Sequence, residues 1–276
     1  MRSIFKPSLW LFLAAASVRA ADPIVSVSTI PVTSSTEPVH AWRQMVNTAF
    51  GPNEELDFDI RWGVVKAGTS SLNIDGLVDV DGRPAYHLVS EAHSTGVVDT
   101  FYKVNDRNEA WLDQASLISV RYSKQLREGS FKEDDLVILD QVAGEWTRTT
   151  ERLDKKTKKT KSGPLPPDTL DVQSSLYVMR TMPMVVGASY RIDVHSGDKI
   201  YPLVVKVKRR EKVKVPAGTF DCFLVEPLLR GPGMFVSKGK KLDVWLTADD
   251  RHMPVRMRSE VFFGHVAAEL THYSPQ

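Results

Sequence analysis

Apolar and polar residues alternate along most of the chain from about residue 54 onward. Between residues 56 and 62, Leu, Phe, Ile and Trp alternate with Asp, Asp and Arg. A period of two places the apolar side chains on one face of an extended segment, which is typical of a β-strand with one buried face. Strands of this kind are predicted at 56–62, 69–79, 85–93, 109–112, 118–126, 132–140, 146–152, 189–195, 199–207, 212–215, 220–225, 242–246, 255–262 and 265–273.

Short turns separate these segments. Asp81-Gly82, Gly197-Asp198 and Pro216-Ala217-Gly218 carry the residues that tight turns require. Short connections favour an antiparallel meander over β-α-β units, whose crossovers are longer. A sheet of this many strands must curl or close. The prediction is an all-β protein, built as one large curved sheet, a barrel or a half-barrel.

Helical spacing is convincing over a single stretch, residues 168–182. Leu170, Gln173, Leu176 and Tyr177 recur at helical intervals, and Pro183 ends the pattern. Asp168 or Thr169 is predicted as the N-cap. We expect this helix to cover one end or one face of the sheet. Residues 95–102 fit a helical turn or a bulged strand.

The first twenty residues carry the features of a secretory signal. Arg2 and Lys6 precede an apolar run of about ten residues, and Val18-Arg19-Ala20 provides a cleavage site. The run is too short to span a bilayer, although a retained anchor is the alternative. Residues 1–20 are therefore predicted to direct export to the periplasm or outer envelope. Residues 21–53 are predicted as a linker or edge segment, with a short helix near 40–48, and residues 54–276 as a single domain.

Charge argues against nucleic acid binding, and the cysteine content excludes an intramolecular disulfide. Removing residues 1–20 takes away three positive charges and turns a formal charge of +2 into −1, which leaves no electrostatic case for nucleic acid binding. Cys222 is the single cysteine, so no intramolecular disulfide can form, and its place between Phe220 and Leu224 predicts a small buried hydrophobe. The basic run at 154–161 is interpreted as a solvated loop, with docking on anionic lipid or polysaccharide as the alternative.

Several polar side chains could carry chemistry, but each also has a structural role. His87, Glu91 and His93 share a strand face, but positions i and i+4 lie about 13 Å apart on a strand, so a polar outer face is favoured over zinc. Asp249-Asp250 is predicted to shape a turn. No nucleophile elbow or zinc-protease motif occurs, so no catalytic, metal or cofactor-binding residue is assigned. The aromatic residues Trp62, Tyr102 and Trp245 are the candidates for lining a ligand cavity.

Several stretches together resemble a family of bacterial envelope proteins, domain of unknown function 3108. The similar stretches are residues 55–68, residues 171–180, Val-Pro-Ala-Gly-Thr-Phe-Asp-Cys at 215–222, and Val244-Trp245-Leu246 followed by Asp249-Asp250 and Met253-Pro254-Val255. The resemblance spans about residues 54–273. It implies export and a β-rich fold, and it supplies no activity and no catalytic residues.

The sequence therefore favours a non-catalytic exported protein that binds a lipid-like or glycan component of the envelope in a β-barrel-type cavity. One alternative is an envelope hydrolase whose site is assembled from distant strands. Another is a structural or assembly partner of the outer envelope. The oligomeric state does not follow from the sequence.

Overall fold

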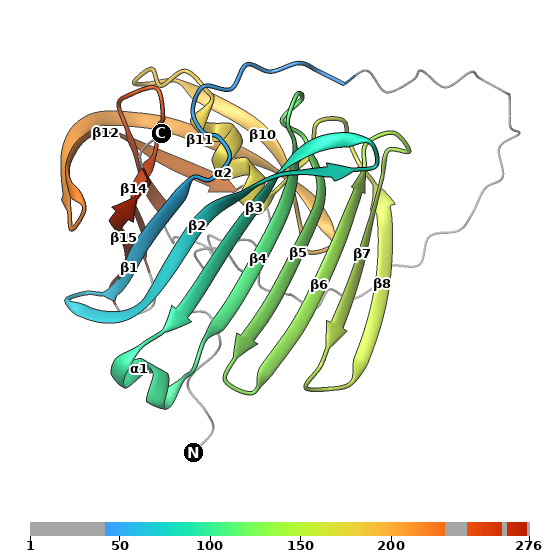
Figure 1. The fold of residues 1–276 in the computed structure, drawn as a ribbon, viewed down its shortest axis with the longest axis horizontal. Helices are drawn as coiled ribbons and strands as arrows, with labels where there is room; N and C mark the ends of the chain where they lie inside the picture. Colours follow the sequence, from blue (N-terminus) through green and yellow to red (C-terminus); the bar gives the residue numbers. More distant parts are fainter. Residues whose placement is uncertain (1–41, 230–241, 261–263, 275–276) are drawn as a thin grey trace, which may run out of the picture.

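The computed structural model describes residues 42–229, 242–260 and 264–274 (Figure 1). The predicted signal segment and most of the predicted linker lie outside these residues. One open, curved sheet of fifteen strands dominates the described chain, with the order β8-β7-β6-β5-β4-β3-β2-β1-β15-β14-β13-β12-β11-β10-β9. Every pair is antiparallel except β9 and β10. The all-β prediction is therefore confirmed.

The strands follow the predicted alternation closely, and two short helices accompany them. In chain order the elements are β1 (Glu55–Trp62), β2 (Val65–Val80), β3 (Arg83–Ser94), α1 (Gly96–Phe101), β4 (Asn105–Asp113), β5 (Ser119–Glu128), β6 (Phe131–Asp140), β7 (Glu145–Arg152), β8 (Thr157–Pro164), β9 (Leu170–Asp171), α2 (Val172–Arg180), β10 (Ser189–Ser196), β11 (Lys199–Val215), β12 (Gly218–Leu229), β13 (Leu242–Thr247), β14 (Pro254–Glu260) and β15 (His265–Tyr273).

The two ends of the sheet meet through side chains. The turn between β10 and β11 lies against the inner side of β7, where the rings of His195 and Trp146 are 4.8 Å apart. Asp198 in this turn accepts hydrogen bonds from Arg148 at 2.8 Å and from Lys161 of β8 at 2.6 Å. Because β8 and β9 are the two ends of the strand order, the sheet coils on itself without closing into a hydrogen-bonded barrel.

The β11–β12 hairpin folds over a neighbouring part of the sheet. At its Pro216-Ala217 turn, the Ala217 amide donates to the carbonyl of Leu270 in β15 at 2.9 Å. Arg256 of β14 donates to the Lys214 carbonyl at 2.7 Å. The hairpin therefore adds a second layer over β14 and β15. Cys222 is fully buried, as predicted, and burial raises the pKa of its thiol to about 12.

Three local predictions were wrong. Asp171, not Asp168 or Thr169, caps α2, because its carboxylate accepts the Ser174 amide at 2.8 Å. Residues 42–48 form no helix; instead the Arg43 side chain and the Met45 amide bond to carbonyls of residues 115–117. The basic run 154–161 is not a loop, since most of it forms the β7–β8 hairpin and edge strand β8. Lysine on an edge strand discourages pairing with other chains, which explains why the strand lacks an apolar pattern.

Gly163 of β8 is expected to be the glycine least tolerant of a side chain in this region. A Cβ atom at this position would lie 2.9 Å from the ring of Trp146, which is itself buried. We expect Gly163→Ala to lower the free energy of unfolding by about 1–3 kcal/mol, as other overpacked sites do. Urea unfolding measures the change, with the exposed neighbour Ser162→Ala as the control. Equal midpoints for the two variants would show that the ring moves aside freely.

Candidate functional site

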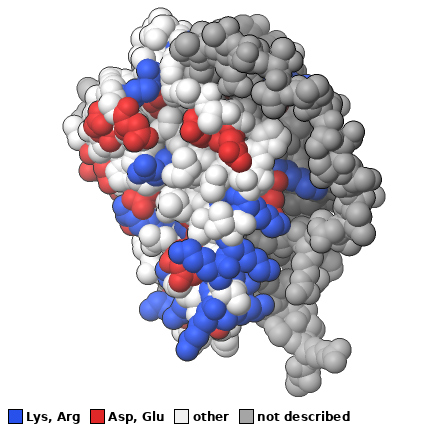
Figure 2. Space-filling model, turned by 90° about the vertical axis from the view of Figure 1, so that its right-hand side faces the viewer, with Lys and Arg blue, Asp and Glu red and all other residues white. Residues whose placement is uncertain are grey.

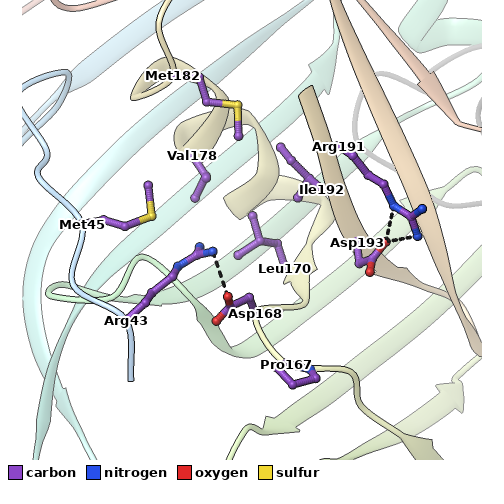
Figure 3. A pocket seen from close by; sticks show the side chains of 10 residues that line it. All are labelled: Arg43, Met45, Pro167, Asp168, Leu170, Val178, Met182, Arg191, Ile192 and Asp193. Carbon is purple, nitrogen blue, oxygen red and sulfur yellow. Dashed lines mark hydrogen bonds and ion pairs between the residues drawn. The ribbon is translucent and has the colours of Figure 1, made fainter. Parts of the chain in front are cut away.

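A cavity of about 290 Å³ lies between α2, β10, the loop between β8 and β9, and the extended segment that precedes β1 (Figure 3). We call it the α2 pocket. Its apolar lining consists of Met45 before β1, Pro167 of the loop, Leu170 of β9, Val178 of α2, Met182 just after α2 and Ile192 of β10. Leu170, Val178 and Ile192 are buried core residues, whereas the two methionines are partly exposed. The pocket therefore has a firm aliphatic floor and adaptable thioether walls.

The local sequence accounts for the position of the pocket. Asp171 starts α2 through its cap, and its other oxygen accepts the Ser119 hydroxyl of β5 at 2.7 Å. Burial raises the pKa of this carboxyl, while the hydrogen bonds from Ser174 and Ser119 oppose the shift. Leu170 is held beside Val194 by the parallel pairing of β9 with β10. These contacts hold α2, β9, β10 and β5 together beside the pocket.

Two ion pairs flank the apolar lining. Arg43 lies 3.3 Å from Asp168, and Arg191 lies 3.2 Å from Asp193 (Figure 3). Arg43 also donates to the carbonyls of Ser116 and Leu117, which fixes its guanidinium at the pocket wall. All four charged side chains are partly or largely exposed to solvent. The pocket thus offers both signs of charge beside aliphatic surface.

A second group of polar side chains is buried on the concave side of β5, β6 and β7. We call Lys124, Glu133, Asp135 and Arg148 the concave cluster. Asp135 pairs with Lys124 at 3.2 Å and with Arg148 at 2.7 Å. Burial alone would raise the pKa of Asp135, but these two cations hold it below its usual value. Each of the four side chains is less than a tenth exposed, so the group acts as an internal tie between strands.

A carboxyl pair extends this polar region toward the β5–β6 turn. The Tyr102 hydroxyl donates to Glu128 at 3.2 Å. Burial raises the pKa of Glu128 to about 7, and the neighbouring charge of Asp106 adds to the shift. The alternative of a hydrolase requires converging carboxylates, and these two do converge. The Glu128 and Asp106 side chains are 8% and 4% exposed, however, so they lie almost entirely below the protein surface.

The three candidate ligand residues are not brought together. Trp62, at the end of β1, is 39% exposed. Tyr102 packs against a small cluster of Ile60, Val104 and their neighbours, away from the α2 pocket. Trp245 is 4% exposed, belongs to the main core, and donates its indole N–H to Glu211 at 2.7 Å. None of the three lines the α2 pocket.

The other candidates have structural partners. His87 stacks on Trp111 and contacts Glu109 at 3.1 Å, while Glu91 pairs with Arg107 at 2.6 Å. Asp249 accepts the Thr247 hydroxyl in a turn, as predicted. Within residues 42–229, 242–260 and 264–274, no group of three or more His, Cys, Asp or Glu side chains is arranged to hold a metal ion.

Fold and site define a class: a β-barrel-like protein whose coiled, open antiparallel sheet holds an amphipathic pocket beside the capped helix α2. The chain belongs to the family described as protein of unknown function DUF3108, whose model matches residues 57–271. No curated protein matches the sequence. In the part of the chain that the structure describes, no helix has the length and apolar character needed to cross a membrane.

One solved structure supports the fold. A β-barrel-like protein of domain of unknown function DUF1849 from Brucella abortus is similar with a TM-score of 0.56 and 10% identity, over 83% of this chain and all of that one. Two weaker similarities each have 10% identity. The first is to a protein from Bacteroides fragilis described as exported, with a YmcC-like fold, at a TM-score of 0.35 over 82% of this chain and 99% of that one. The second is to a protein from Parabacteroides distasonis described as a lipoprotein, at a TM-score of 0.32 over 83% of this chain and 100% of that one.

Proposed function

We propose that the protein is an exported envelope protein that binds a small lipid-like amphiphile in the α2 pocket without reacting with it. The observation that supports this proposal is the pairing of an aliphatic floor with two exposed ion pairs around one cavity. Concave sites with apolar walls and a few placed polar groups are the usual form of small-molecule sites, and about 290 Å³ is near the lower end of their range.

The lining favours a lipid-like ligand over a glycan. Sugars are commonly held between aromatic faces and side-chain amides, and the residues around the α2 pocket include neither. Methionine, leucine, valine and isoleucine instead favour binding of an alkyl chain, because contact with them removes its methylene groups from water. Arg43 or Arg191 would receive an anionic head group, and Asp168 or Asp193 a cationic one.

The first experiment asks what the exported protein carries. Small molecules extracted from protein purified after export are identified by mass spectrometry, and binding of a fluorescent fatty acid is then titrated. We expect an amphiphile to co-purify with the wild-type protein. We expect Met182→Trp, which fills the pocket, to weaken fatty-acid binding by about tenfold or more, equivalent to about 1.4 kcal/mol.

Val185→Trp is the matched control. Val185 is 60% exposed, lies three residues beyond Met182, and does not line the pocket. It should bind the probe as the wild-type protein does. Wild-type protein that neither carries an amphiphile nor binds the fatty acid would refute the proposal, as would equal binding by Met182→Trp.

A further inference from the structure

Four connections of the first half of the sheet lie along one edge. Because consecutive strands are antiparallel neighbours, the β1–β2, β3–β4, β5–β6 and β7–β8 connections emerge on the same side, at the bottom of Figure 1. We call residues 62–66, 101–103, 129–132 and 153–158 the turn rim. Two kinds of exposed side chain predominate on it, and the carboxylate of Asp154, which also lies there, pairs with Arg152 at 2.7 Å.

The first kind is large and apolar. Val64 is 87% exposed and Phe101 is 83% exposed, while Val65, Trp62 and Leu153 are exposed by 53%, 39% and 38%. Phe101 is the last residue of α1, and Val64 lies at the tip of the β1–β2 turn. Single exposed apolar residues are ordinary, but here three of the four connections carry one.

The second kind is basic. The exposed lysines of the turn rim are Lys66, Lys103, Lys132, Lys155, Lys156 and Lys158. Lys66 pairs with Asp59 and Lys158 with Glu151, but within the described residues no carboxylate lies within 4 Å of the other four. Figure 2, which faces the β8 side, shows basic side chains gathered at the lower end with a few acidic ones among them, and larger acidic groups higher on the same face. On the opposite edge, the turns carry exposed Asp79, Asp81 and Asp140.

Protection of a sheet edge does not account for these lysines. That role fits Lys158 on edge strand β8. Lys103, in contrast, lies in the β3–β4 connection and Lys132 at the start of β6, both among interior strands where no edge is open to pairing. Solubility does not account for Phe101 and Val64, because exposed apolar tips reduce it.

We propose that the turn rim docks on an anionic lipid surface. Lysines near such a surface are attracted by about 1 kcal/mol each, and apolar side chains beside them enter the boundary between head groups and acyl chains. An anionic polysaccharide would pair with the lysines but would leave the apolar tips in water, so the combination favours a bilayer. Docking would place the acidic edge on the side away from the membrane.

The test measures co-sedimentation of the exported protein with vesicles of phosphatidylcholine alone or mixed with phosphatidylglycerol. We expect binding to the anionic vesicles, weakened by salt, and little to phosphatidylcholine. Lys155→Gln combined with Lys156→Gln should weaken binding by roughly 25-fold, at about fivefold per lysine. Phe101→Ser alone should also weaken binding. Its effect should be larger in the presence of salt, because salt screens the lysines and leaves the apolar contact as the main attraction.

Matched controls lie away from the rim. Lys212 and Lys214 are exposed on β11, and Val142 is 66% exposed on the opposite edge. Lys212→Gln with Lys214→Gln, and Val142→Ser, should leave vesicle binding unchanged. No binding to anionic vesicles, equal binding to both vesicle types, or equal losses in rim and control variants would each overturn the proposal. Met182→Trp should still bind vesicles, so failure at the α2 pocket and failure at the rim are distinguishable.

Discussion

Arg180→Ala is expected to unfold the protein or to lower its free energy of unfolding by on the order of 3–5 kcal/mol, the usual cost of breaking a buried ion pair. Arg180 is 1% exposed and is the largest fully buried side chain in the described chain. Its guanidinium forms two hydrogen bonds with Glu54, at 2.6 and 2.7 Å. Removing the arginine leaves the Glu54 carboxylate buried, with Arg251 at 3.4 Å as the remaining cation beside it among the described residues.

The same arginine joins three parts of the chain. It lies at the end of α2, donates to the Ala49 carbonyl of the segment before β1, and donates to the Arg251 carbonyl between β13 and β14. Its own carbonyl contacts His252 at 2.6 Å. We therefore expect the loss to loosen α2 and the wall of the α2 pocket together, so that amphiphile binding falls along with stability.

A double replacement separates charge burial from packing. Arg180→Met with Glu54→Leu removes both charges and keeps most of the volume, so it should be more stable than either single variant. Urea unfolding and melting temperature provide the measurements. Arg191→Ala, which removes a pair that is 68% exposed at the arginine, is the control and should cost less than about 1 kcal/mol. A single-variant loss as small as that of the control would contradict the prediction.

The alternation of apolar and polar residues predicted the strands because each strand buries one face. Leu56, Phe58 and Ile60 illustrate this, since all three are at most 3% exposed. The pattern failed for β8 because an edge strand needs little burial: its residues are exposed except for a half-buried Gly163 under Trp146. The cap of α2 was placed too early because Asp168 and Asp171 both suit the role, and only tertiary contacts with Ser119 and Ser174 select Asp171.

Long-range contacts account for what the sequence could not predict. Glu54 and Arg180 are 126 residues apart, and the sequence around each gives no sign that the side chain is buried in an ion pair. The α2 pocket combines Arg43, Met182 and Ile192 from separate elements, and methionine at helical spacing indicates a core equally well. The coiling of the sheet depends on Asp198 reaching Arg148 from fifty residues away. Turn chemistry correctly identified the Gly197-Asp198 turn but carried no information about what it contacts.

Glu128→Gln is expected to stabilise the protein above neutral pH. The pKa of Glu128 is about 7 in the folded protein and 4.5 in its ordinary state. A carboxyl whose pKa is raised by folding stabilises the fold fully below pH 4.5, and this contribution is lost as the pH rises toward 7. At about 1.4 kcal/mol per pH unit, the full loss for Glu128 is about 3–4 kcal/mol.

The neighbours of Glu128 support the direction of this effect. Burial raises the pKa of Asp106 as well, so the two carboxyls resist ionising together, and Lys124 only partly offsets them. Tyr102 donates to Glu128 and can donate equally to a glutamine oxygen. The glutamine amide can in turn donate to Asp106. The substitution therefore keeps the local contacts and removes the ionisation.

The measurement is the difference in unfolding free energy between variant and wild-type protein across pH 5 to pH 8. The difference is needed because His195, whose pKa burial lowers to about 4, changes the stability of both proteins in the opposite sense over part of this range. The variant should gain on the wild-type protein by about 2–3 kcal/mol from pH 5 to pH 8. Glu151→Gln, at a partly exposed position, should show no such gain. A pH-independent difference for Glu128→Gln would mean that Glu128 is ionised throughout and that Lys124 outweighs its burial.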